Sequence, residues 1–294
     1  MADRAIRRNR SQGWKWAKLT GHQLEVELAD RIKNEPDLGR ELGSRILGRD
    51  VGSPNSVSGG GVAAERILDV FGNHTNGKPD IYLRWRDLPP VNISLKKSTS
   101  GQVFLTSVDR FVTGFRAQFN LLVPSRVVEM LHLFIGTDKE RCEVAMRGRK
   151  YFGPLHRNQT TLQEEHQHRI LGITLDQHFK EDWELSLNWM KSNASNIADF
   201  VFARGYAMHR KDYATHVWYL TLQDDVVEID QIIPISEICT HADANSGRVA
   251  VGPRNGGSTI VFPFGFLQMH SPQGENQIQF HHQHHKISGL GNIG

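Results

Sequence analysis

The sequence predicts a mixed α/β (α+β) fold, with a mixed central β-sheet flanked by helices and a β-rich C-terminal part. Three observations lead to this prediction. The stretches Gly77–Trp85 and Val91–Lys97 alternate apolar and polar residues with the two-residue period of half-buried strands. Apolar residues at helical spacing precede this pair of strands and recur after it. From Arg248 onward, short apolar runs alternate with glycine turns, which is typical of strands.

Length and composition describe a chain that can bury a sizeable core. It has 294 residues, 38% of them hydrophobic. The net charge is only +3, so any polyanion-binding surface must come from local clusters of charge. Cys142 and Cys239 form neither a disulfide scaffold nor a zinc motif. No apolar run approaches a membrane span or a signal peptide, so we expect a cytoplasmic protein with no membrane partner.

The N-terminal segment, residues 1–20, is expected to form a basic arm. It holds six Lys and Arg residues against a single acid, Asp3, together with Trp14 and Trp16. Such an arm could follow a phosphate backbone. A solvated tail whose tryptophans pin it to the core is an equal alternative.

The first helix is predicted to begin in Thr20–Ile32. Its inner stripe consists of Leu24, Leu28, Ala29 and Ile32. Glu25 falls inside this stripe, where an acid is costly unless it is paired or holds a metal. The alternative is a glutamate at the edge of the stripe that reaches solvent. After this helix, Ser53–Gly61 is expected to be a Gly/Ser connector without a nucleotide-binding ending, and Ala63–Phe71 a short helix.

The two alternating stretches are predicted to form a hairpin around the turn Arg86–Pro90. If the hairpin closes symmetrically about Leu88, Asp80 lies directly across from Lys96. Side chains paired in this way are roughly 5 Å apart. A carboxylate and an ammonium would then meet on the polar face of the sheet, although an ordinary surface ion pair would produce the same pattern.

The motif Pro79-Asp80, followed on the next strand by Ser94-Leu95-Lys96, resembles the PD-(D/E)XK nuclease superfamily, which includes most type II restriction endonucleases. The resemblance implies a restriction-endonuclease-like core in a prokaryotic cell. It also implies that Asp80 and a second acid hold Mg²⁺ and that Lys96 assists the attacking water. A backbone carbonyl near Leu95 would help to hold the metal. No small-molecule cofactor is expected.

This sequence departs from the family at one position, because Ser94 stands where the second acid belongs. Ser94 would at most hold a water. The resemblance implies two substitutes for the missing acid. Gly21 and Glu25 match the Gly-x-x-x-Glu that many restriction endonucleases carry on the helix before the Pro-Asp strand, and Asp109 lies on a later predicted helix.

The elements after the hairpin complete the predicted core. Ser98–Gln102 is polar and small, and its backbone amides could approach a phosphate. Leu105–Phe119 should be a helix that carries Asp109 and Arg110. Another helix should start at Pro124-Ser125, and Leu131–Gly136 should be a further strand.

The second half of the chain is predicted to hold helices in Glu181–Gly205 and then mostly strands. The predicted strands are Thr215–Thr221, Val226–Ile233, Val249–Val251, Ser258–Phe262, Gly265–Met269 and Gln277–Phe280, with a helical turn at Ile235–Cys239. The glycine-punctuated region, with Arg248 and Arg254, is a candidate for reading a DNA groove. The role of the histidine run His281–His285 stays open.

Together these features predict a type II restriction endonuclease that is Mg²⁺-dependent, cleaves double-stranded DNA at a short specific sequence and acts as a homodimer. The candidate DNA contacts are Lys97, Arg110, Arg248 and Arg254. The expected organisation is a basic arm (1–20), a catalytic core (21–136) and a part (137–294) that completes the domain for DNA recognition and dimerisation. Two alternatives remain: another PD-(D/E)XK nuclease that acts in repair or on junctions, and a DNA-binding protein without catalysis.

Overall fold

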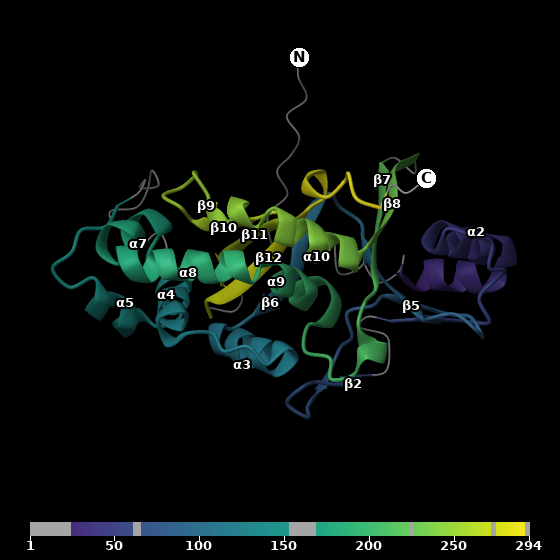
Figure 1. Cartoon of the computed structure of the whole chain (residues 1–294), viewed down its shortest axis with the longest axis horizontal. Helices are drawn as coiled ribbons and strands as arrows, with labels where there is room; N and C mark the ends of the chain where they lie inside the picture. Colours follow the sequence, from purple (N-terminus) through teal and green to yellow (C-terminus); the bar gives the residue numbers. More distant parts are fainter. Residues whose placement is uncertain (1–24, 61–65, 153–168, 224–225, 272–274, 292–294) are drawn as a thin grey trace, which may run out of the picture.

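The computed structural model describes residues 25–60, 66–152, 169–223, 226–271 and 275–291. Within these residues the fold is mixed α/β, as predicted. It contains two five-stranded sheets and a two-stranded hairpin, with helices packed against the sheets. The molecule is elongated in Figure 1, with the first sheet toward one end and the second sheet near the middle.

The first sheet has the strand order β1-β4-β5-β7-β8. Its strands are β1 (Ser56–Gly59), β4 (Ile81–Arg84), β5 (Val91–Lys96), β7 (His216–Gln223) and β8 (Val226–Pro234). β5 and β7 run parallel, whereas the other neighbouring strands are antiparallel, so the sheet is mixed. The strands β4 and β5 are the predicted hairpin.

The second sheet has the order β6-β12-β11-β10-β9 and is antiparallel throughout. Its strands are β6 (Ser100–Thr106), β9 (Ala250–Val251), β10 (Thr259–Phe262), β11 (Gly265–His270) and β12 (Gln277–Gln283). The four strands predicted near the C-terminus are therefore confirmed as β9 to β12. A small hairpin of β2 (Ile67–Leu68) and β3 (His74–Thr75) lies apart from both sheets.

Two helices cover the outer face of the first sheet. They are the helical residues 25–34 and α2 (Pro36–Leu47), and α2 lies beyond β5 at the end of the molecule (Figure 1). Leu28, Ala29 and Ile32 are buried there, as the helical stripe predicted. They pack with the apolar side chains of β4 and β5 and with Trp218 of β7 in one cluster.

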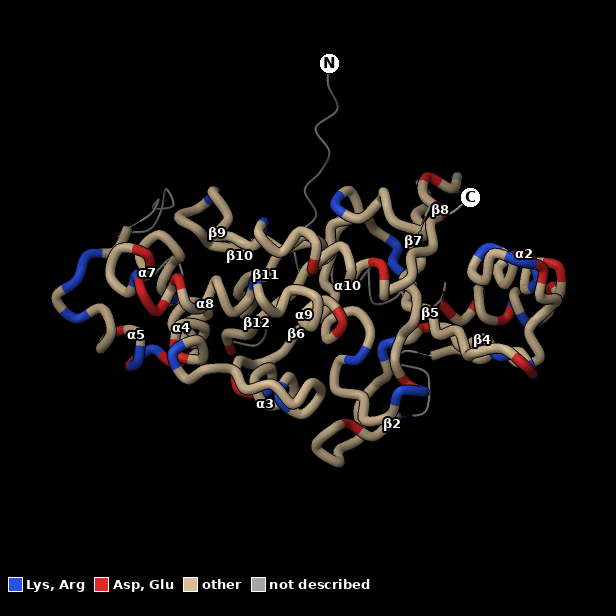
Figure 2. The backbone as a smooth tube through the Cα atoms, viewed as in Figure 1, with Lys and Arg blue, Asp and Glu red and all other residues tan. Residues whose placement is uncertain are grey.

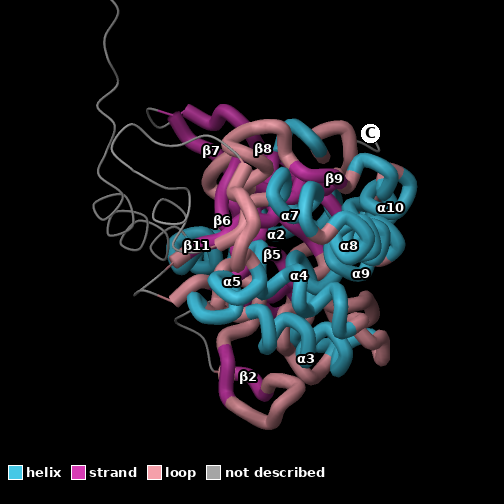
Figure 3. The backbone as a smooth tube through the Cα atoms, turned by 90° about the vertical axis from the view of Figure 1, so that its left-hand side faces the viewer, coloured by secondary structure: helices cyan, strands magenta, loops and turns pink. Residues whose placement is uncertain are grey.

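The remaining helices surround the second sheet. They are α3 (Val108–Phe119), α4 (Ser125–Ile135), α5 (Lys139–Ala145), α7 (Gly172–His178), α8 (Lys180–Ser192), α9 (Ala194–Asp199), the π-helix η2 (Phe200–Arg204) and α10 (Ile235–Ala244). Short 3-10 turns are η3 (Arg210–Asp212), η4 (Ser246–Arg248) and η6 (His284–Lys286). Figures 1 and 3 show α8, α9 and α10 together on one side of the second sheet.

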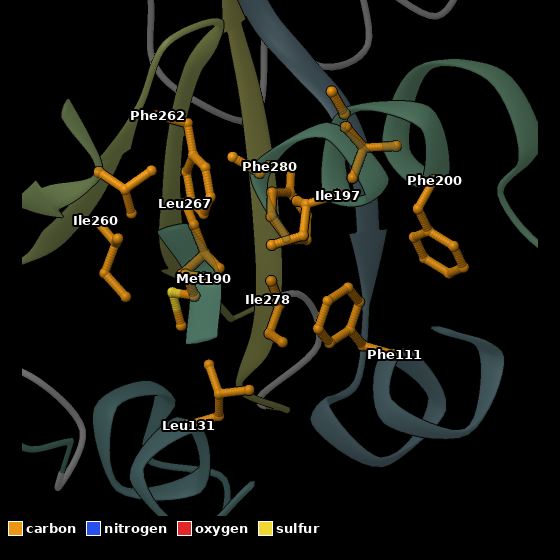
Figure 4. Close-up of a cluster of buried hydrophobic side chains, with 14 of the residues drawn as sticks. Phe111, Leu131, Met190, Ile197, Phe200, Ile260, Phe262, Leu267, Ile278 and Phe280 are labelled. Atoms are coloured by element: carbon orange, nitrogen blue, oxygen red, sulfur yellow. The ribbon is translucent and has the colours of Figure 1, made fainter. Parts of the chain in front are cut away.

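The larger core lies between these helices and the second sheet (Figure 4). Phe111 and Phe200 approach the inner face of the sheet from the helices, and Phe280 meets them from β12. Val217 and Tyr219 of β7 also belong to this core. The first sheet is therefore buried on both faces, which explains why polar residues of β5 that were expected at a surface are inside.

The apolar run Leu131–Gly136 is not a strand, contrary to the prediction. It forms the C-terminal part of α4, which ends at Gly136 in the left-handed conformation with φ 71°. The helix is buried from Met130 through Ile135. Because every residue from Met130 to Ile135 is buried, this short window shows no helical period and resembles a buried strand.

Two further boundaries differ from the prediction. The described part of the predicted helix Ala63–Phe71 is not helical but contains β2 and the turn that leads to β3. The Asp69 carboxylate stabilises this turn because it accepts the backbone N–H groups of Phe71 and Asn73. Residues 63–65 lie outside the described residues. The predicted loop at 98–102 and the start of the next predicted helix instead form β6, so that α3 begins at Val108.

The two parts that the sequence suggested, 21–136 and 137–294, share both sheets. β7 and β8 complete the sheet of β4 and β5, and β6 pairs with β12 from near the other end of the chain. The predicted basic arm, residues 1–20, lies outside the described residues. In the described ranges, no helix is both long and apolar enough to cross a bilayer.

Candidate active site

Asp80 is held rigidly at the start of β4. Its backbone N–H donates to the carbonyl of Ile93 on β5, and its carbonyl accepts the N–H of Gly60 after β1, both at 2.7 Å. Gly60 fits because its backbone approaches the hairpin closely: a Cβ at this position would come within 2.2 Å of the Pro79 carbonyl oxygen. Asp80 is thus fixed between two neighbouring strands.

The register of the hairpin differs from the prediction by two residues. Ile81 pairs with Ile93 and Leu83 with Val91, so the same spacing places Asp80 opposite Ser94 rather than opposite Lys96. The predicted faces survive, because a shift of two residues keeps every side chain on its side of the sheet. Ile81, Leu83, Val91 and Ile93 are buried in one apolar cluster, as predicted.

The Asp80 carboxylate is bound by the strand opposite. Its Oδ2 accepts the backbone N–H of Leu95 at 2.7 Å and lies 3.4 Å from the Ser94 hydroxyl oxygen. Lys96 folds back over the same residues: its Nζ lies 2.8 Å from the Ser94 Oγ and 3.3 Å from the Leu95 carbonyl oxygen. Asp80, Ser94, Leu95 and Lys96 therefore form one hydrogen-bonded group.

The charges at this site act on one another. Burial raises the pKa of Asp80 above its ordinary value, and the positive charge of Lys96 opposes that rise. Burial lowers the pKa of Lys97, whereas the charges of Glu25 and Asp80 favour its ionised form. Glu25, on the first helix, therefore lies within electrostatic range of the strand that carries Lys96. Gly21, the other residue of the predicted helix motif, lies outside the described residues.

Lys78, which was not among the predicted site residues, lies within electrostatic range of Asp80 and Lys96. Its Nζ donates to the carbonyl of Val103 at 2.8 Å and lies 4.2 Å from the centre of the Phe104 ring. Burial lowers its pKa well below the ordinary value, and the charge of Lys96 lowers it further. No local pattern indicated it, because the chain bends at Lys78 and the residue that accepts its hydrogen bond lies 25 positions away in the sequence.

Asp109 and Arg110 lie elsewhere. β6 follows Lys96 and precedes α3 in the chain, and its seven residues span roughly 20 Å. At its far end Asp109 is paired with the Nε2 of His132 at 3.2 Å. Arg110 forms an ion pair at 3.1 Å with the fully buried Asp69, and its guanidinium lies 4.4 Å from the centre of the Tyr206 ring.

Arg248 and Arg254 lie on the second sheet's side of the molecule. Arg248 ends η4 and Arg254 follows β9, and both are exposed. In Figure 1 β9 lies on the far side of the second sheet from α2, near α7 and α8, whereas β5 lies toward α2. Figure 2 shows Lys and Arg interspersed with Asp and Glu along the described chain.

The histidine run has separate structural contacts. The ring of His281 stacks on Phe266, with centroids 4.5 Å apart and planes inclined by 8°. The Nδ1 of His282 lies 3.1 Å from the hydroxyl oxygen of Tyr219, and His284 packs against the same ring. Burial lowers the pKa of His281 to about 4 and that of His282 to about 3. His282 and His284 contact Tyr219 of the first sheet, whereas His281 packs on its neighbour within the second sheet.

The donor atoms around Asp80 fit Mg²⁺. They are oxygens: the Asp80 carboxylate, the Ser94 hydroxyl and the Leu95 carbonyl, and two of these already contact the ammonium of Lys96. Mg²⁺ prefers oxygen ligands and is usually bound by one or two carboxylates and several waters. In the part of the chain that the structure describes, no three His, Cys, Asp or Glu side chains gather into a metal-binding group. Asp80 would therefore bind the ion together with water, the Leu95 carbonyl and at most one further acid such as Glu25.

Comparison with known proteins identifies no family for this chain. No family model and no curated protein sequence matches it. Among solved structures, its fold is similar to a crystal structure of the restriction endonuclease MspI in complex with its cognate DNA. The TM-score is 0.46 and the sequence identity 10%, over 87% of this chain and 83% of that one. A likeness of this size assigns no activity, so the function must be argued from the site itself.

Proposed function

We propose that this protein is a Mg²⁺-dependent endonuclease that hydrolyses phosphodiester bonds in double-stranded DNA at a short specific sequence, as type II restriction endonucleases do. The observation that carries the proposal is the hydrogen-bonded group in which Asp80 accepts the Leu95 N–H while Lys96 contacts Ser94. A half-buried carboxylate and an ammonium on adjacent strands are two of the three charged groups of the PD-(D/E)XK motif, and the third, the second acid, is replaced by Ser94.

Each residue of the site has a separate role in the proposed reaction. Asp80 and the Leu95 carbonyl would hold the ion, and Glu25 would supply the second carboxylate in place of the acid missing at Ser94. When bound, Mg²⁺ would neutralise the charge that builds up on the phosphate during attack. The Lys96 ammonium would orient the attacking water and donate an N–H to the developing negative charge. Lys97, on which both Glu25 and Asp80 act, adds a second positive group near the bound phosphate.

The reaction is a simple displacement. A water oxygen forms a bond to phosphorus and gives up one proton to surrounding water, the P–O ester bond on the opposite side breaks, and the leaving oxygen takes up a proton. The uncatalysed reaction is very slow, so most of the rate must come from charge neutralisation and from placing the water. Asp80 is suited to this task because its backbone bonds to Ile93 and Gly60 fix it before substrate binds.

We further propose that the protein acts as a homodimer. One site of this kind cuts one strand, whereas a two-fold dimer presents two sites to the two strands of a palindromic target. Light scattering of the purified protein, alone and with cleaved DNA, would measure this. A mass of one chain under both conditions would contradict the dimer and leave the catalytic proposal intact.

Digestion of a supercoiled plasmid with and without Mg²⁺ tests the main proposal. We expect discrete fragments whose ends map to one short sequence, and no cleavage when EDTA removes the metal. Cleavage of branched DNA in preference to the plasmid would favour a junction-cleaving nuclease. Specific DNA binding without cleavage would favour a non-catalytic DNA-binding protein, for which the serine at position 94 is the main argument.

A further inference from the structure

Lys78 links the segment that carries Asp80 to the second sheet. It lies two residues before Asp80, yet its ammonium donates to the carbonyl of Val103 on β6 at 2.8 Å. Asp80 itself is bonded to β5 and to the segment after β1, both in the first sheet. The Lys78 side chain therefore joins the start of β4 to the other sheet.

The acceptor of this bond lies at a point where β6, the edge strand of the second sheet, is irregular. Phe104 pairs with Phe280 and Gln102 pairs with His281, so Val103 has no partner residue on β12. An extra residue of this kind interrupts the ladder of backbone hydrogen bonds and leaves polar groups to be satisfied in another way. The ammonium of Lys78 satisfies the carbonyl of that residue.

The Lys78 side chain lies between the Phe104 ring and the backbone of Gly205. Phe104 covers the ammonium on one side, with the ring centre 4.2 Å away. Gly205, which follows η2, has φ +52°, and a Cβ there would lie 3.1 Å from the Cε of Lys78 and 3.3 Å from the Phe104 ring. A side chain at position 205 would crowd both neighbours. The slot is thus built from β6 and the end of the π-helix.

A half-buried ammonium in such a slot is costly unless it forms a specific hydrogen bond. An apolar side chain of the same length would fill the space without that cost. What the amine adds is the bond to Val103, which fixes the distance between the two sheets at the site. Because Asp80 is two residues away, this bond also limits where the carboxylate can lie relative to Lys96.

We propose that Lys78 is a positioning residue, which holds Asp80 in register with Lys96 by joining the start of β4 to the bulged carbonyl of Val103. This inference rests on the proposed nuclease function. Lys78 is assigned no contact with the phosphate or the metal. Its effect reaches the reaction through the placement of the Asp80 carboxylate.

Three variants test the proposal. Lys78→Met keeps the length of the side chain and removes the donor, whereas Lys78→Arg keeps both donor and charge. Lys286→Met is the matched control, because Lys286 also donates its ammonium to backbone carbonyls of the second sheet region, those of Phe262 at 2.8 Å and Gly265 at 3.0 Å. Each variant would be measured for plasmid cleavage, for DNA affinity and, by NMR, for hydrogen exchange of the Leu95 amide that binds Asp80.

We expect Lys78→Met to lower kcat by about 10- to 100-fold, the scale of a misplaced catalytic group, with KM within about 3-fold of the wild type. The Leu95 amide should exchange about tenfold faster, because its acceptor is no longer held. Amides of β8 should keep their protection. Lys78→Arg should recover most of both effects, and Lys286→Met should show neither.

Three results would overturn the inference. One is unchanged kcat and exchange in Lys78→Met, and a second is an equal loss in Lys286→Met, which would indicate a general effect of stability. The third is a raised KM with normal kcat, which would make Lys78 a phosphate contact. If the wild-type protein cleaves no DNA, the proposed function fails, and the exchange of Leu95 still tests whether Lys78 holds Asp80.

Discussion

The ammonium of Lys96 lies 2.8 Å from the hydroxyl oxygen of Ser94, the residue at the position where the PD-(D/E)XK motif has a second acid. Ser94 is nearly buried, and its hydroxyl also lies 3.4 Å from the Asp80 carboxylate. The Ser94 hydroxyl therefore lies between the Lys96 ammonium and the Asp80 carboxylate and contacts both. It keeps the two charged groups in one network without adding a second negative charge.

Replacing Lys96 with methionine should abolish most cleavage and leave DNA binding largely unchanged. The ammonium contacts the Ser94 hydroxyl beside Asp80 and can meet developing charge, and removal of one such donor costs on the order of 10²- to 10³-fold in rate. Initial rates on a mapped plasmid site and a filter-binding Kd would measure the two effects. Lys33→Met, at an exposed position of the first helix, is the control. A Lys96→Met protein with full activity would exclude a catalytic role for this lysine.

Replacing Ser94 with alanine should have a smaller effect than the loss of either charged group. The variant loses a hydrogen bond to a charged donor, worth about 1.5–3 kcal/mol, or roughly a 10- to 100-fold loss in rate. The Mg²⁺ concentration for half-maximal rate should change little if Ser94 is not a ligand. A large increase in that concentration would instead place the serine in the metal site.

Replacing Arg110 with alanine should lower stability and not DNA affinity. Arg110 pairs with Asp69, a fully buried carboxylate whose other oxygen accepts two backbone N–H groups. Because the arginine is itself half-exposed, we expect a loss of about 1–3 kcal/mol in the free energy of unfolding. Urea denaturation and a binding titration would measure this. A normal unfolding curve with weakened DNA binding would restore Arg110 as a DNA contact.

Stability should fall in mild acid because of His282. Burial lowers its pKa from 6.5 to about 3, so the folded protein holds the ring neutral. As the pH falls from 6.5 toward 3, the unfolded chain takes up a proton there that the folded protein does not. The free energy of unfolding should then decrease by up to about 1.4 kcal/mol per pH unit from this group.

The His282→Gln variant should show a weaker dependence of stability on pH over this range, measured by denaturation at several pH values. His285→Gln is the control, since His285 is exposed. The slope of stability against pH is the measured quantity, so a variant that is less stable at every pH still gives an answer. Equal slopes for wild type and His282→Gln would contradict the assignment.

The parts of the fold that depend on local pattern were predictable from the sequence. The alternation in β4 and β5 gave the correct faces, and the helical stripe gave Leu28, Ala29 and Ile32 correctly. The register was not predictable from symmetry, because the turn Arg86–Pro90 sets it and the turn does not close about Leu88. The error placed Asp80 one pair away from its true neighbour, Ser94.

The parts that depend on distant segments were not predictable. β6 resembles a polar loop in sequence and becomes a strand because β12, far along the chain, pairs with it. The link from Lys78 to Val103 joins residues 25 positions apart in the sequence, so no local signal indicates it. The catalytic roles of Asp80, Lys96 and Glu25 stay predictions, because the sequence and the fold bring the groups together without measuring their chemistry.

Cleavage by Asp80→Asn tests the central claim most directly. Mapped digests with Mg²⁺ would compare the wild type, Asp80→Asn and Asp87→Asn, a control in the exposed hairpin turn. We expect discrete fragments from the wild type and from Asp87→Asn, and a loss of at least about 10²- to 10³-fold in Asp80→Asn with its specific DNA affinity retained. Wild-type cleavage by Asp80→Asn would contradict the proposal that this carboxylate forms the catalytic centre.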